Sequence, residues 1–256
     1  MSGGSARGLA HIGVYKVLTE AGIRPSFLTG TSVGSIIGAG IAAGMSWQDL
    51  TEMARGVFWP KLLHGGNLER FCARHLPRHF SDLQIPFAAI ATALPDKHAI
   101  AITTGPLASA ISASCAMRVI RGPVHREGHV LKDGGIARAL PADFCRHLGA
   151  EFVIGSDVWE VSSLLRGIGV DPAHPQARRF YPSQYHVSLL HTDLLIHPQV
   201  PLAGYWPGEA GVERMIAAGE QAARQALEHY MPEGNVSAGS PAPHSEARSS
   251  GSTARV

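Results

Sequence analysis

Segments typical of strands and of helices alternate along most of this chain, and this alternation limits the folds that it can adopt. Short apolar runs at residues 26–29 (SFLT), 86–94 (PFAAIATAL) and 151–158 (EFVIGSDV) predict strands. Apolar residues recur at helical spacing in segments such as 9–23 and 209–230. Alternation of this kind predicts an α/β layered fold with a mostly parallel central sheet.

The composition fits one large domain followed by a tail. The chain has 256 residues, of which 45% are hydrophobic and 16% charged, so it can bury a sizeable core. Residues 233–256 are mainly Ser, Gly, Pro and Ala, a composition typical of disorder. We therefore expect a folded domain over residues 1–232 and a disordered tail over residues 233–256.

Charge and cysteine content exclude several classes of protein. The net charge of +2 comes without a concentrated basic stripe, which argues against nucleic-acid binding. No apolar run approaches the ~20 residues that cross a bilayer, and the start MSGGSARG lacks the apolar core of a signal peptide. The three cysteines, Cys72, Cys115 and Cys145, have no metal-binding spacing. We expect a cytoplasmic chain with reduced thiols, no metal and no cofactor, able to touch a membrane peripherally.

The stretch GTSVG, Gly30–Gly34, lies between a predicted strand and a helix rich in small residues. A Gly-x-Ser-x-Gly turn in this context exposes the serine hydroxyl at a helix N-terminus, whose dipole favours developing negative charge. Ser32 is therefore a candidate nucleophile. The pattern alone is weak, since a chain with 29 glycines can match it by chance.

A glycine-rich segment, Ser2–Gly8 (SGGSARG), directly precedes the first predicted helix. It matches neither the Walker pattern nor the dinucleotide-binding pattern. Successive amides before a helix can bind an anion, and an acyl hydrolase needs such donors for its oxyanion. The amides of Gly3 and Gly4 are candidates, and the alternative is an unstructured terminus.

A nucleophilic serine needs a base, and two kinds are present. The segment KDGGI, residues 132–136, places Asp133 on a sharp turn after a predicted strand, where a partly desolvated carboxylate can act as base. Asp-Gly turns are also common without any such function. His191 and His197, beside the late strand TDLLI, are the candidates for a conventional Ser–His–Asp arrangement.

Three motifs in this order, SGGSARGLAHIGV, GTSVG and DGG, resemble the patatin-like phospholipases, particularly their bacterial branch. The resemblance covers nearly the whole folded part, including AISASCAM before DGG and LPADFCRHLGAEFVIGSDV after it. It implies a three-layer α/β/α sandwich and a Ser–Asp dyad without histidine.

The resemblance implies a role for each matching residue. Ser32 would be the nucleophile and Asp133 its base. The amides of Gly3, Gly4 and Ser5 would form the oxyanion hole. Arg7 would anchor that loop, and the glycines of the loop, elbow and turn are Gly8, Gly30, Gly34, Gly134 and Gly135.

The implied activity is hydrolysis of carboxylic esters of phospholipids or lysophospholipids through an acyl-enzyme. Two departures leave alternatives open. The family has a strand before the glycine loop, whereas this chain begins two residues before Gly3, so the first strand is expected to be truncated. Residues 118–124 (RVIRGPV) also differ from the family pattern. An impaired member that binds lipid or a partner, and a Ser–His–Asp esterase, are the alternatives.

Overall fold

The computed structural model describes residues 1–55, 57, 59–62, 64–117, 122–172, 174–200 and 208–230. The predicted tail from 233 and residues 118–121 of the divergent segment lie outside these residues. Every structural statement below concerns the described part of the chain.

Seven described strands form two sheets. The strands are β1 (Leu28–Thr31), β2 (Phe87–Leu94), β3 (His98–Ile102), β4 (Val124–Arg126), β5 (His129–Asp133), β6 (Ile154–Ser156) and β7 (Leu194–Ile196). The larger sheet has the order β1-β2-β5-β4, with β3 also paired to β2. Strands β6 and β7 form a separate parallel pair.

The larger sheet is mixed, which corrects the expectation of a mostly parallel one. Only β1 and β2 pair in parallel, whereas β2–β3, β2–β5 and β4–β5 are antiparallel. Two hairpins cause this difference. Strands β2 and β3 are joined by the turn 95–97, and β4 and β5 by Glu127 and Gly128, both with positive φ as a two-residue hairpin turn needs.

Strands β1 and β5 meet end to end beside β2. Thr31, the last residue of β1, is opposite Ile90, and Asp133, the last residue of β5, is opposite Ala91. Strand β3 pairs with residues 89–93 of β2 and so occupies its other edge. The residues that follow β1 and those that follow β5 therefore leave the sheet at the same point.

Ten helices and four 3-10 turns surround the strands in the described residues. The helices are α1 (Ala10–Glu20), α2 (Val33–Ala42), α3 (Trp47–Arg55), α4 (Trp59–Leu62), α5 (Asn67–His75), α6 (Leu107–Ser114), α7 (Ala142–His147), α8 (Glu160–Gly167), α9 (Ser183–Leu190) and α10 (Glu209–Tyr230). The 3-10 turns are η1 (Ser5–Leu9), η2 (Phe80–Asp82), η3 (Gly134–Ile136) and η4 (Arg178–Phe180).

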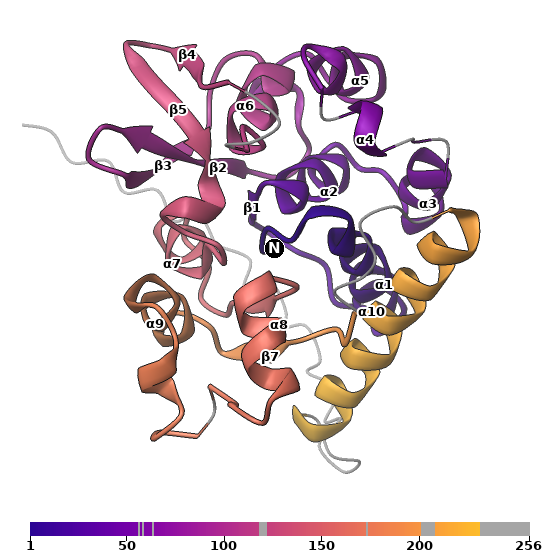
Figure 1. Cartoon of the computed structure of the whole chain (residues 1–256). Coiled ribbons are helices and arrows are strands. Elements are labelled where there is room, and N and C mark those ends of the chain that lie inside the picture. The colour runs from indigo at the N-terminus through magenta and orange to yellow at the C-terminus, as the bar shows by residue number, and fades with distance from the viewer. Residues whose placement is uncertain are drawn as a thin grey trace, which may run out of the picture.

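The helices form layers on both sides of the sheet, as the three-layer prediction requires. Helix α2 packs on β1 and β2, α6 packs on β2 and β5, and α7 packs on β1 from the side opposite α2 in Figure 1. Helices α1 and α10 lie side by side, and a Cβ added at Gly219 would come within 1.9 Å of the Ala10 carbonyl oxygen, so this crossing requires glycine. No described helix has both the length and the apolar character needed to cross a bilayer.

Candidate active site

Ser32 occupies a strained turn between β1 and α2. Its backbone has φ 52° and ψ −124°, in a region that non-glycine residues rarely adopt. The turn is tight because a Cβ added at Gly30 would lie 2.2 Å from the carbonyl oxygen of Gly34. A Cβ added at Gly34 would lie 2.6 Å from the carbonyl oxygens of Met1 and Ser2. The predicted nucleophile elbow is thus built as a strand–turn–helix that presents Ser32 at the start of α2.

Ser114, which the sequence analysis did not identify, holds this turn in place. Its hydroxyl accepts a hydrogen bond of 2.9 Å from the Ser32 amide and donates one of 2.6 Å to the Ile90 carbonyl. The Ser35 hydroxyl donates to the Ser32 carbonyl at 2.6 Å. Both polar groups of the strained Ser32 backbone are therefore satisfied without using its side chain.

Asp133 ends β5 and caps the turn η3. Its Oδ1 accepts a hydrogen bond of 2.8 Å from the Gly135 amide, while Oδ2 is buried and has no hydrogen-bond partner among the described residues. Gly134 packs against β2, where an added Cβ would lie 2.2 Å from the Ile90 carbonyl oxygen. The turn thus fixes one carboxylate oxygen and leaves the other available.

Burial raises the pKa of Asp133 to about 6, while the Gly135 amide and the Ser32 hydroxyl act to lower it. The Ser32 hydroxyl is therefore close to the carboxylate, although no hydrogen bond of ordinary geometry joins the two. A carboxylate with this pKa is ionised at neutral pH and basic enough to accept a proton.

Cys115 lies beside the same groups. Its Sγ is 3.9 Å from the Ser35 hydroxyl, and burial, followed by the charge of Asp133, raises the pKa of its thiol. The thiol is protonated at neutral pH and is not a nucleophile.

The glycine loop lies against Ser32. A Cβ added at Gly3 would be 3.4 Å from the Ser32 Cβ. The Gly3 amide donates to the Ala139 carbonyl at 3.0 Å. It therefore already has an acceptor, whereas the sequence led us to expect it to donate to the oxyanion. The amides of Gly4 and Ser5 have no acceptor among the described residues. Ser5 has a positive φ of 51°, another strained position in the same loop.

Three groups fix the loop to the rest of the fold. The buried Arg7 forms an ion pair with Glu160 at the start of α8. Gly8 sits on α2, where an added Cβ would lie 2.2 Å from the Val33 side chain. His11, not identified from the sequence, bonds Ser156 Oγ at 2.7 Å through Nδ1 and the Ser2 carbonyl at 3.0 Å through Nε2. Burial lowers the pKa of His11 to about 3, so the ring is neutral.

The candidate histidines lie in other surroundings. His197 is buried with Nδ1 3.8 Å from Oδ2 of Asp157, and His191 is the C-cap residue of helix α9. Asp157 also accepts hydrogen bonds from the Tyr185 hydroxyl at 2.5 Å and the Trp159 amide at 2.9 Å. Burial acts to raise the pKa of Asp157, but its partners hold it well below its usual range. This cluster is structural, and no described contact connects either histidine to Ser32.

Comparisons with known proteins identify similar sequences and folds. The family model described as patatin-like phospholipase matches residues 1–55, which contain both the glycine loop and the elbow. Patatin-like phospholipase domain-containing protein 6 of Homo sapiens is 32% identical over 179 residues. An uncharacterized NTE family protein of Mycobacterium bovis is 33% identical over 193 residues. In sequence, this chain resembles the patatin-like phospholipases.

The patatin-like chain spans only part of these relatives. The matches cover 62% of it and 13% of the human protein, and 67% of it and 32% of the mycobacterial one. Among solved structures, VipD from Legionella pneumophila matches with a TM-score of 0.55 and 12% identity, over 89% of this chain and 66% of that one. At this identity the likeness concerns the fold, and it places the chain in the same α/β architecture.

Proposed function

We propose that the chain is a serine lipid acyl hydrolase in which Ser32 and Asp133 form a catalytic dyad. The observation that carries the proposal is the meeting of β1 and β5 beside β2, which brings the elbow serine to a buried carboxylate with a free oxygen. The raised pKa of Asp133 supports its role as a base.

In the first half-reaction, Oγ of Ser32 attacks the ester carbonyl carbon while its proton passes to Oδ2 of Asp133. The resulting oxyanion accepts hydrogen bonds from the amides of Gly4 and Ser5, whose N–H groups are otherwise unused. When the tetrahedral intermediate collapses, the bond to the alcohol oxygen breaks and Asp133 returns the proton to that oxygen. An alcohol or lysolipid leaves, and the acyl group stays on Ser32.

In the second half-reaction, Asp133 takes a proton from a water molecule, whose oxygen attacks the acyl carbonyl carbon. Collapse of the second intermediate releases a fatty acid and restores the Ser32 hydroxyl with the proton held by Asp133. Both half-reactions use the same base and the same amides, and neither needs a histidine.

Phospholipids or lysophospholipids are the proposed substrates, following the names of the relatives. An exposed apolar stripe near the loop supports contact with a lipid surface. Val161 and Leu164 of α8 and its C-cap residue Ile168 recur at helical spacing and are 36%, 52% and 69% exposed. Helix α8 begins at Glu160, the partner of Arg7, so this stripe lies on the helix that anchors the glycine loop.

Hydrolysis of a short-chain p-nitrophenyl ester tests the dyad. Ser32→Ala and Asp133→Asn should each lose at least 10³-fold in kcat/KM, as loss of a nucleophile or its base does elsewhere. The wild-type rate should rise with pH, reaching about a tenth of its plateau at pH 5 and half of it near pH 6. Circular dichroism checks that each variant is folded.

Matched variants sharpen the comparison. Ser112→Ala removes a buried hydroxyl that has no hydrogen-bond partner among the described residues, and it should leave the rate unchanged. His197→Gln should keep most of the activity, because the proposed dyad does not use a histidine. A Ser–His–Asp esterase that used His197 would lose its activity. A folded but inactive wild-type protein would instead favour a binding role, which vesicle sedimentation of wild type and Leu164→Glu would then measure.

A further inference from the structure

Ser5 carries a side chain at a backbone position that favours glycine. Its φ of 51° lies in the left-handed region, where a side chain is unfavourable and glycine is not. The two residues before it, Gly3 and Gly4, are glycines. A hydroxyl held at a strained position in a loop beside Ser32 is a candidate for a function of its own.

The Ser5 hydroxyl has a weak partner in the structure. Its oxygen is 4.0 Å from the sulfur of Met117, and no other hydrogen bond of this hydroxyl is found among the described residues. A thioether sulfur is a weak acceptor. The hydroxyl can therefore turn to a stronger acceptor, such as a negatively charged oxygen, at little cost.

Met117 places this hydroxyl beside the groups of the site. It belongs to a four-residue segment, 114–117, that contacts each of them in turn. The hydroxyl of the first residue accepts from the Ser32 amide at 2.9 Å, and the carbonyl of the third accepts from the Asp133 amide at 3.1 Å. The fourth residue contacts the Ser5 hydroxyl. The Ser5 side chain thus extends from the glycine loop toward the segment that supports Ser32 and Asp133.

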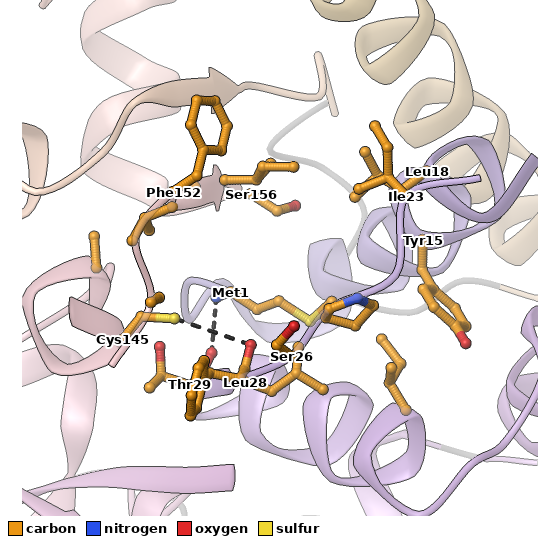
Figure 2. A pocket seen from close by; sticks show the side chains of 18 of the residues that line it. Met1, Tyr15, Leu18, Ile23, Ser26, Leu28, Thr29, Cys145, Phe152 and Ser156 are labelled. Atoms are coloured by element: carbon orange, nitrogen blue, oxygen red, sulfur yellow. Dashed lines mark hydrogen bonds between the residues drawn. The ribbon is translucent and has the colours of Figure 1, made fainter. Parts of the chain in front are cut away.

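The loop is held on both sides of Ser5. The Ser2 amide donates to the Ser156 carbonyl at 2.9 Å, and Arg7 is paired with Glu160. Ser156 also lines the cavity of about 540 Å³ shown in Figure 2, whose described lining residues do not include Ser5. A loop fixed in this way can hold a donor ready for a developing charge without rearranging during the reaction.

We propose that the Ser5 hydroxyl is a third oxyanion donor, beside the amides of Gly4 and Ser5. This inference rests on the proposed function. As the bond between Ser32 Oγ and the ester carbonyl carbon forms, an electron pair moves to the carbonyl oxygen, and the Ser5 hydroxyl turns from Met117 to donate to it. The hydroxyl keeps its proton throughout, so the proton still passes from Ser32 to Asp133 and on to the leaving alcohol oxygen.

The effect of such a donor falls on kcat. The negative charge on the ester oxygen grows as the tetrahedral intermediate forms, so the hydrogen bond stabilises the transition state more than the bound ester. A hydroxyl that only clamped the loop onto Met117 would behave differently, because loss of the Met117 side chain would then have the same effect as loss of the hydroxyl.

Hydrolysis of a short-chain p-nitrophenyl ester and thermal unfolding test the proposal on Ser5→Gly, Ser5→Ala and Met117→Leu. Both Ser5 variants remove the hydroxyl and keep the amide, and each should lose kcat about 10²-fold with KM changed by less than about twofold. Only glycine suits the φ of 51°, so Ser5→Gly should unfold roughly 2–4 °C above Ser5→Ala. Met117→Leu keeps the volume and the Ser5 hydroxyl, and its kcat should stay within about twofold of wild type.

Three results would overturn the proposal. The first is a kcat for Ser5→Gly equal to that of wild type. The second is a loss in Met117→Leu as large as in Ser5→Gly, which would make Ser5 a clamp. The third is a loss in Ser5→Ala alone, which would trace the effect to backbone strain.

The variant Ser32→Ala separates this inference from the proposed function. If wild-type hydrolysis does not depend on Ser32, the hydrolase proposal fails and the third donor fails with it. If hydrolysis depends on Ser32 but is unchanged in Ser5→Gly, only the third donor is refuted.

Discussion

Replacing Asp133 with asparagine should stabilise the fold while it abolishes hydrolysis. The pKa of this carboxyl is raised from 3.8 to about 6, mainly by burial, so the folded protein holds its ionised form at an unfavourable free energy. Asparagine keeps an oxygen that can accept from the Gly135 amide and carries no charge. The variant removes the unfavourable ionisation and keeps the turn.

The size of this effect follows from the two pKa values. The difference between 3.8 and about 6 corresponds to about 3 kcal/mol, at 1.36 kcal/mol for each tenfold change. Part of the Asp133 surface is accessible to solvent, which reduces the expected gain to about 1–2 kcal/mol. For a domain of this size, that gain raises the unfolding midpoint by about 2–8 °C.

The gain in stability from Asp133→Asn should depend on pH in a specific way. Well below pH 3.8 the carboxyl is protonated in both the folded and the unfolded protein. Its ionisation then makes no difference to the stability of wild type relative to Asp133→Asn. Between pH 3.8 and about 6 the unfolded chain releases the proton first, and wild-type stability falls as pH rises. The advantage of Asp133→Asn should therefore be complete at pH 8 and fall to about one third at pH 4.5.

Urea unfolding of wild type, Asp133→Asn and Asp96→Asn at pH 8 and pH 4.5 measures this difference. Asp96 lies exposed in the β2–β3 turn and should show no such gain. If Asp133→Asn is no more stable than wild type at pH 8, the carboxylate is not held ionised at an energetic disadvantage. A gain of equal size at both pH values would point to improved packing instead, and it would equally contradict the reasoning.

Three further perturbations test how the site is supported. Ser114→Ala should lower kcat by about tenfold in the ester assay and destabilise the fold by about 1–3 kcal/mol, because the Ser32 amide loses its acceptor. Gly30→Ala should reduce the unfolding midpoint severely, since its Cβ would lie 2.2 Å from a backbone oxygen, whereas Gly22→Ala, at φ +76° in open space, should cost only about 1 kcal/mol. His11→Ala should destabilise the wild type at pH 7 in urea unfolding but less so near pH 4, because the folded protein holds His11 neutral with a pKa of about 3 and loses stability as pH falls below 6.5.

The local features of the site were predictable from sequence because each has its own short-range cause. The elbow needs glycines around Ser32, and the turn after β5 needs Asp133 followed by glycine. Each of these turns can therefore be predicted from a short sequence motif. The helix α10 was predicted with its observed bounds, because its apolar spacing is long and regular. The shared family motifs then linked Ser32 with Asp133.

The way the strands meet could not be predicted in the same manner. The alternating pattern predicted a mostly parallel sheet. In the structure β1 and β5 approach from opposite directions and meet beside β2, a register set by the pairing of Thr31 with Ile90 and of Asp133 with Ala91. Local periodicity carries no information about such pairing, and a hairpin such as β4–β5 reverses the direction of the strand.

Long-range contacts also explain why other features of the structure were not predicted from the sequence. Helices α8 and α9 were not predicted from the sequence, and their positions depend on contacts such as that between Tyr185 and Asp157. The Gly3 amide was expected to face the oxyanion, but it bonds to Ala139, which lies far away in sequence. Ser114 could not be identified from the sequence, because its role depends on the hydrogen bond that it accepts from the Ser32 amide.

Several features of the site are unfavourable for the fold. Ser32 and Ser5 have positive φ, which costs on the order of 1–3 kcal/mol at each position. Gly4 is buried with an unused amide, and a buried donor without an acceptor costs about 1–3 kcal/mol. Asp133 is held ionised against its own burial. Mutations that relieve such features are readily available to a chain that only binds lipid, so finding all of them around one hydroxyl favours a hydrolase over an impaired family member.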